Sequence, residues 1–280
     1  MGLTWPVFAA VLFGALLHAS WNALVKSSTD KSLDMAVIHL IGSGLAIPLV
    51  ALVGWPAAAA WPYIAASVVI HIGYYIATTQ AYQHGDLGLT YPLMRGVAPL
   101  LVALSATFTV HEVLTPLAWA GILGISCGVL ILGLSRHALH APKAVGFALT
   151  NAVIIAIYTV VDALGVRASG NALQYIAALF LLDGWPFARV MMARRGRAVG
   201  AYARHRWPVA TLGAVASLGS YSIALWAMTR APVATVAALR EASVLFAMLI
   251  SSWFLKEAFT LRRMLGTCAI VGGVMAMRLA

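Results

Sequence analysis

The sequence carries little charge for its length. Only 9% of its 280 residues are Asp, Glu, Lys or Arg, whereas 62% are hydrophobic. A soluble domain has about 25% charged residues. Eight acidic and eighteen basic residues are too few to cover the surface of a soluble fold of this length. The composition excludes a soluble domain and indicates an integral membrane protein surrounded by a lipid bilayer.

Cysteine is nearly absent as well. Cys127 and Cys268 both lie in apolar runs, which excludes a disulfide framework and a metal-ligand spacing. We therefore expect no metal and no cofactor. The first apolar run, from Trp5 to Val25, has neither a basic n-region nor a small-residue cleavage site, so it predicts a spanning helix rather than a signal peptide.

Catalytic motifs are scarce. GISCG (124–128) matches the G-x-S-x-G pattern of serine hydrolases, but that motif requires a strand-turn-helix setting and here it lies inside an apolar run. No aspartate lies nearby and no histidine matches it. Phosphate-binding loops are also missing, and we expect that the protein is not an enzyme.

Apolar runs between polar residues predict ten membrane-spanning helices, because a span needs about 20 apolar residues. None shows the period-two alternation of a closed barrel. The predicted fold is an all-α integral membrane bundle. The expected spans are 5–26, 34–53, 59–83, 88–110, 115–134, 143–165, 172–192, 207–228, 233–255 and 262–279.

The second half of the chain repeats the first. A shift of 145 residues superposes six pairs of identical residues, namely Thr90/Thr235, Arg95/Arg240, Leu100/Leu245, Glu112/Glu257, Gly121/Gly266 and Gly128/Gly273. We therefore predict two five-helix repeats, residues 1–138 and 139–280. Because five is odd, the second repeat must be inverted in the membrane, an arrangement that is common in transporters.

Lysine and arginine predict the orientation, since basic residues favour cytoplasmic loops. Most of them lie in the connections after helices 1, 3, 5, 7 and 9, which we expect to be cytoplasmic, with both termini extracytoplasmic. The basic stretch ARRGRAVGAYARHR (193–206) is expected to be a loop. Nucleic-acid binding is an alternative explanation for it, but topology explains its charge more simply, and we expect no nucleic-acid partner.

Two arginines interrupt apolar helices at equivalent positions. Arg95 and Arg240 lie about seven residues, or roughly 10 Å, into their helices, and a glutamate follows each by 17 residues. We expect each arginine near one membrane face and each glutamate near the other. The arginines either bind carbonyls and lipid headgroups or act in gating, and Glu241 is expected to neutralise Arg240.

Helix 4 contains two prolines, Pro92 and Pro99, which remove backbone donors and are expected to kink it. Helix 9 has no internal proline. We interpret helices 4 and 9 as the moving gates, with Pro92, Arg95, Pro99, Arg240 and Glu241 as the gating and hinge residues.

Polar side chains that line one face of a membrane helix are candidate substrate ligands. Four helices, two from each repeat, carry such stripes and are expected to face one cavity. For single residues there are simpler roles, because tyrosine often anchors a helix at the interface and histidine can bond a carbonyl of a neighbouring helix. The candidates are His18, Trp21 and Asn22; His71, Tyr75, Thr78 and Tyr82; Asn151, Tyr158 and Asp162; and Ser217 and Tyr221.

The chain resembles a known family. LMRGVAPLLVALSATFTVHE and LREASVLFAMLISSWFLKE, each followed by a glycine-bearing helix (GILGISCG and GTCAIVGG), resemble the two repeats of EamA-type members of the drug/metabolite transporter superfamily. HASWNALVKSSTD near the N-terminus is also typical of that group. The chain departs from the family where Gly-Glu often ends the fourth helix of each repeat, because His-Glu and Lys-Glu stand here.

The resemblance implies a bacterial inner-membrane exporter of amino acids or related small metabolites, with neutral and aromatic amino acids as the nearest match. Its cavity would lie between the halves and alternate in access. Since one chain holds both repeats, we expect a monomer.

Two rival transport functions remain. A proton-coupled multidrug or cation exporter of the small multidrug-resistance type needs an acidic residue in its first helix, which is missing here, although Asp162 on helix 6 is a substitute. A lipid or polyprenyl carrier would need a lateral opening between helices, which a sequence does not show.

Overall fold

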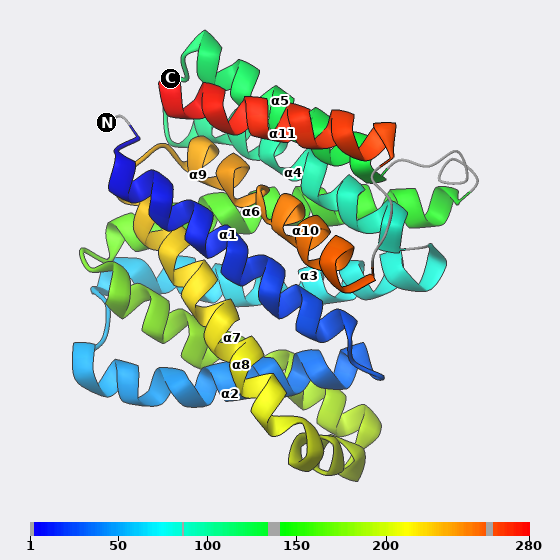
Figure 1. Ribbon diagram of the computed structural model, residues 1–280. Coiled ribbons are helices and arrows are strands. Elements are labelled where there is room, and N and C mark those ends of the chain that lie inside the picture. Colours follow the sequence, from blue (N-terminus) through cyan, green and yellow to red (C-terminus); the bar gives the residue numbers. More distant parts are fainter. Residues whose placement is uncertain (1–2, 86, 134–140, 256–259) are drawn as a thin grey trace.

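The computed structural model describes residues 3–85, 87–133, 141–255 and 260–280. These residues form helices joined by short connections, and no strand occurs among them (Figure 1). The elements are α1 (Trp5–Lys26), α2 (Lys31–Val53), a 3₁₀ turn η1 (Ala58–Ala60), α3 (Trp61–His84), α4 (Leu87–Thr109), α5 (Pro116–Gly133), α6 (Pro142–Ala168), α7 (Ala172–Arg195), α8 (Arg197–Met228), α9 (Val233–Arg240), α10 (Ser243–Leu255) and α11 (Leu261–Leu279).

Short polar residues define several helix starts. The Asp30 carboxylate accepts the backbone N–H groups of Ser32 and Leu33, both at 3.1 Å, at the start of α2. Asn171 accepts the N–H of Leu173 at 3.0 Å at the start of α7. These side chains satisfy backbone donors that the first turn of a helix leaves free.

The pairing of helices follows the sequence repeat. If α1, α2, α3, α4 and α5 correspond to α6, α7, α8, α9 with α10, and α11, then α2 packs against its own equivalent α7, and α5 against α11. The correspondence also turns the contact of α1 with α8 into the contact of α6 with α3. In the same way it turns the contact of α4 with α6 into the contacts of α1 with α9 and α10. The contacts are therefore symmetric under the predicted correspondence, and the halves interleave rather than form separate bodies.

Glycines allow a close contact between α5 and α11, which lie side by side in Figure 1. A Cβ atom on Gly121 would lie 2.9 Å from the carbonyl oxygen of Gly273, and one on Gly273 would lie 2.6 Å from that of Gly121. Gly128 and Gly266 make the same reciprocal approach, at 2.7 and 3.0 Å. The two contacts are related by the sequence repeat, because the 145-residue shift pairs Gly121 with Gly266 and Gly128 with Gly273.

The helices confirm the prediction of an all-α integral membrane fold. Among the described residues, nine segments are long and apolar enough to cross a bilayer, and one of them, Val233–Ile250, runs from α9 into α10. The remaining helix, α11, carries Arg262 and Arg263 at its start and Arg278 at its end. The protein is therefore a multi-pass membrane protein.

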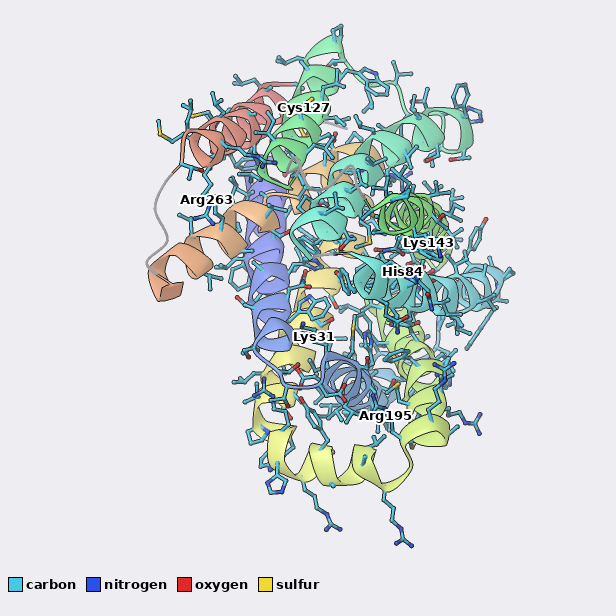
Figure 2. All side chains as sticks on the ribbon, turned by 90° about the vertical axis from the view of Figure 1, so that its right-hand side faces the viewer. Lys31, His84, Cys127, Lys143, Arg195 and Arg263 are labelled. Carbon is cyan, nitrogen blue, oxygen red and sulfur yellow. The ribbon has the colours of Figure 1, made fainter. Side chains whose placement is uncertain are left out.

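The basic stretch 193–206 is not the loop that we expected. It is helical apart from the junction at Gly196, whose φ of 52° ends α7 and separates it from α8. The first turns of α8 run across the end of the bundle at a steep angle to the rest of that helix (Figure 2). Arg197 and Arg204 are exposed in this segment.

The ninth predicted helix is broken although it contains no proline. α9 ends at Arg240 and α10 begins at Ser243, and backbone hydrogen bonds across the break run from residue i to i−3, as from Ala242 to Leu239. α4 remains one helix through Pro92 and Pro99. Every residue of α9 is buried, so this short helix lies in the interior of the bundle.

We predict that Gly273→Ala weakens the fold. The added methyl group would lie 2.6 Å from a backbone carbonyl oxygen and 2.8 Å from the backbone nitrogen of Ile125, so α5 and α11 must separate. Overpacking of this kind costs about 1–3 kcal/mol. Thermal unfolding in detergent should show a lower midpoint.

The adjacent Gly272→Ala is the matched control, because nothing lies within 4 Å of a Cβ there. It should leave the unfolding temperature unchanged or raise it, since alanine is the better helix former. Equal midpoints for the two variants would show that the α5–α11 contact does not depend on its glycines.

Candidate functional site

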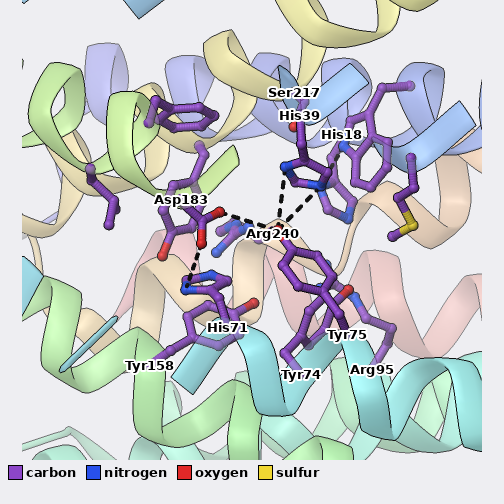
Figure 3. A pocket seen from close by; sticks show the side chains of 15 residues that line it. His18, His39, His71, Tyr74, Tyr75, Arg95, Tyr158, Asp183, Ser217 and Arg240 are labelled. Carbon is purple, nitrogen blue, oxygen red and sulfur yellow. Dashed lines mark hydrogen bonds and ion pairs between the residues drawn. The ribbon is translucent and has the colours of Figure 1, made fainter. Parts of the chain in front are cut away.

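A cavity of about 80 Å³ lies in the bundle between the two halves. Its walls come from α1, α2, α3 and α4 of the first half and from α6, α7, α8 and α9 of the second (Figure 3). The lining residues are His18, Trp21, Met35, His39, His71, Tyr74, Tyr75, Arg95, Tyr158, Leu179, Phe180, Asp183, Ser217, Tyr221 and Arg240.

The four predicted polar stripes meet at this cavity. The residues among the twelve substrate candidates that line it are His18, Trp21, His71, Tyr75, Tyr158, Ser217 and Tyr221. The remaining five, Asn22, Thr78, Tyr82, Asn151 and Asp162, do not line it. Each stripe therefore contributes at least one residue to the cavity wall, but three of the four line the cavity along only part of their length.

Most of the non-lining candidates have partners elsewhere. The Asn22 amide donates to the carbonyl oxygen of His18 on its own helix at 2.8 Å. The Asn151 amide donates to Thr78 Oγ1 at 3.0 Å and contacts Met94 Sδ at 2.7 Å, which links α6 to α3 and α4. Tyr82 packs against an apolar cluster of α3, α4 and α6 that includes Met94 and Ile155.

Sequence reasoning missed α2 and α7, which provide Met35 and His39, and Leu179, Phe180 and Asp183. Neither helix has a polar stripe. The signal was nevertheless present, because an ionisable residue inside an apolar span is a functional candidate by itself, and His39 and Asp183 are such residues. Tyr74 was missed because it lies one position from the predicted face of α3.

Aromatic rings form most of the cavity wall. The rings of His71 and Tyr158 are tilted by 30° with their centroids 4.5 Å apart, and Tyr74 meets Tyr158 edge-on at 5.9 Å. Phe180 and Tyr221 are 6.1 Å apart on the side of the second half. Such a wall offers apolar surface with polar tips.

The ion pair of Glu241 is with Arg95 of the first half, whereas we expected Glu241 to neutralise its neighbour Arg240. Arg95 Nε and Glu241 Oε2 lie 2.8 Å apart, and both side chains are buried. The pair joins α4 to the break between α9 and α10. Because Glu241 lies in that break, its side chain leaves the course of the helix toward Arg95.

Arg240 has a different environment from Arg95. Its guanidinium carbon lies 5.2 Å from the centroid of the Tyr221 ring, a cation–π distance. Within the described part of the chain it forms no ion pair, and its Nε has no hydrogen-bond partner. Arg95 and Arg240 line one cavity between the halves, whereas we expected each of them near a membrane face.

Asp162 lies behind the cavity wall. Its carboxylate accepts the hydroxyl of Tyr175 at 2.8 Å and also that of Tyr221, and it is fully buried. These bonds connect α6, α7 and α8. Tyr221 thus contacts Asp162 through its hydroxyl and Arg240 through its ring face.

Glu112 caps α9 from the other half of the protein. Its carboxylate accepts the backbone N–H of Val233 at 2.8 Å and of Ala234 at 3.3 Å. It also pairs with Arg167 of α6 at 3.2 Å. A carboxylate at a helix N-terminus is favourable for the helix dipole. Its repeat equivalent, Glu257, lies outside the described residues.

Comparison with known proteins agrees with this architecture. Residues 142–279, just under half of the chain, match the model of the EamA-like transporter family. A solved structure, titled only as the crystal structure of a protein, superposes with a TM-score of 0.76 over 97% of this chain and 96% of that one, at 20% sequence identity. Among proteins with curated descriptions, none matches significantly.

The match and the spanning helices together indicate a membrane transporter. The matched residues cover α6 to α11, the part of the chain predicted to be the second repeat, and they support a place in the drug/metabolite transporter superfamily. The members of the matched family are transporters and not enzymes. The structural likeness, at 20% identity, shows the fold alone.

We predict that Glu241→Gln destabilises the protein strongly. The substitution leaves the Arg95 guanidinium buried without its carboxylate, and breaking a buried pair in this way costs about 3–5 kcal/mol. The double variant Arg95→Met/Glu241→Met, which removes both charges, should lose less. The unfolding midpoint of each variant in detergent, compared with that of the wild type, measures both losses of stability.

The control is Asp30→Asn, which changes an exposed pair with Arg195 at 3.7 Å and retains a good helix cap. Its unfolding midpoint should stay close to that of the wild type. An equally small effect from Glu241→Gln would mean that the buried pair contributes nothing to stability.

Proposed function

We propose that this protein exports amino acids, chiefly neutral and aromatic ones, by alternating access through the cavity. The two halves, divided near residues 138 and 139, would move relative to each other around it. The proposed location is the bacterial inner membrane, with the basic connections in the cytoplasm, both termini outside and a monomer as the working unit.

The observation that carries the proposal is the chemistry of the cavity wall. Rings of His71, Tyr74 and Tyr158 offer apolar surface to a side chain. Arg240 presents a guanidinium group without an ion pair among the described residues. A planar guanidinium is well suited to a carboxylate, which it binds through two parallel hydrogen bonds.

The size of the cavity supports a transport cycle rather than permanent binding. Its volume of about 80 Å³ is below the ~300–1,000 Å³ typical of ligand pockets. Wall residues must therefore move apart before a solute enters. The break between α9 and α10, and the prolines of α4, are the proposed hinges, and the Arg95–Glu241 pair is a contact that opening would disturb.

A proton-coupled cation exporter is the second candidate. It is favoured by Asp162, a fully buried carboxylate one side chain away from the cavity. The two tyrosine hydroxyls on Asp162 and the guanidinium of Arg240 in the cavity weigh against it, since a cation would meet like charge there.

Uptake by liposomes that contain the purified protein tests the two candidates. We expect saturable flux of labelled threonine, methionine, phenylalanine and tryptophan, and none of a lipophilic cation dye. Each solute is measured with and without a proton gradient. Flux of the dye alone would replace the amino-acid exporter by the cation exporter.

We also predict that Arg240→Gln raises the half-saturating concentration of phenylalanine about tenfold or more, because a charge-assisted contact is lost. Arg230→Gln is the matched control, since Arg230 also lies over a ring, that of Trp226 at 5.6 Å, but does not line the cavity. The same half-saturation in both variants would remove Arg240 from the carboxylate site.

A further inference from the structure

One carboxylate in the cavity has an oxygen without a donor. Asp183 of α7 accepts the hydroxyl of Tyr75 on Oδ2 at 3.1 Å. Its other oxygen, Oδ1, is buried and has no hydrogen-bond partner in the described part of the chain. A buried carboxylate oxygen left in this way is unfavourable unless a donor reaches it.

His71 does not supply that donor. Its Nδ1 lies 2.9 Å from the carbonyl oxygen of Ser67 on its own helix and 3.9 Å from Asp183 Oδ1 (Figure 3). With its hydrogen on Nδ1, His71 donates to the Ser67 carbonyl oxygen; with its hydrogen on Nε2, Nδ1 accepts from Ser67 Oγ at 3.2 Å. In both tautomers Nδ1 is engaged by Ser67. The longer distance to Asp183 exceeds hydrogen-bond range. Asp183 therefore keeps one acceptor free beside the cavity.

The other charges near the cavity already have partners. Glu241 is paired with Arg95, and Asp162 accepts two tyrosine hydroxyls. His39 lies 3.3 Å from the Tyr75 hydroxyl, on the Oδ2 side of Asp183. Among the residues that line the cavity, the buried atoms without a hydrogen-bond partner in the described part of the chain are Asp183 Oδ1, Arg240 Nε, and Nε and Nη2 of Arg95. Of the two arginines, Arg95 is held in an ion pair by Glu241, which leaves Arg240 as the guanidinium without a carboxylate.

We propose that Asp183 binds the α-ammonium group of the substrate while Arg240 binds its α-carboxylate, so that the cavity selects zwitterions. This inference rests on the proposed amino-acid transport and adds the rule for which solutes qualify. An α-amino acid with both ends free satisfies both groups, and the aromatic wall accommodates its side chain.

The pair also explains why related solutes should fail. An amine without a carboxylate leaves Arg240 without an acceptor, and a carboxylic acid without an amine leaves Asp183 Oδ1 without a donor. Sites built to hydrogen-bond a substrate group reject analogues that lack the group, because the buried partner is then left unsatisfied.

The first test is competition against labelled phenylalanine flux in liposomes with the wild-type protein. The competitors are unlabelled phenylalanine, 2-phenylethylamine and 3-phenylpropionate, which share the ring and differ at the two ends. We expect each analogue to compete about tenfold or more weakly than phenylalanine. If 2-phenylethylamine or 3-phenylpropionate competes as well as phenylalanine, the zwitterion rule is overturned.

The second test is Asp183→Asn, an isosteric change that removes the charge. We expect a rise in the half-saturating concentration of phenylalanine of about tenfold or more, and a smaller preference for phenylalanine over 3-phenylpropionate. Asp183→Glu should recover part of the lost affinity. Asp30→Asn, the same chemical change outside the cavity, should leave flux as in the wild type.

The outcomes separate the two proposals. Absence of saturable flux for every amino acid in the wild type would overturn the proposed function and the zwitterion rule with it. Normal phenylalanine half-saturation in Asp183→Asn would overturn the ammonium site alone. If that variant does not fold, the competition series with the wild-type protein decides the question without it.

Discussion

The ion pair between Arg95 and Glu241 is the interaction on which the rest of the site depends. It joins α4 of the first half to the break between α9 and α10 of the second, and both side chains are buried. Removing two charges from water is costly, so the geometry must hold them together. With Glu241 committed to Arg95, Arg240 is left without a carboxylate beside the cavity.

The position of α9 is set by two carboxylates, one from each half of the protein. Glu112 of the first half caps its start through the N–H groups of Val233 and Ala234, and Glu241 ends it by turning toward Arg95. The short helix is buried along its whole length between these points. A buried helix held at its ends by charges is suited to carry Arg240, because its place is set by contacts to both halves.

Transport and stability make opposite demands on this bundle. The glycine contacts between α5 and α11 bring two backbones together and leave no room for a methyl group, so this pair is suited to a fixed position. The cavity wall consists instead of rings, hydroxyls and ion pairs that meet at single atoms. Such contacts can be exchanged between two arrangements, whereas a close-packed backbone contact cannot.

The sequence by itself determined the membrane setting and the all-helical fold, because the bilayer imposes long apolar runs on the composition. It also predicts two inverted repeats, from residues that recur at a fixed spacing. It predicts four polar stripes as well, each of which contributes residues to the cavity wall. It did not determine which charges pair. Arg240 and Glu241 are neighbours in the chain, but successive residues of a helix point in different directions, so Glu241 meets Arg95. The break in the ninth helix, and the place of His39 and Asp183 on the cavity wall, were likewise decided by contacts between the halves, which only the tertiary structure contains.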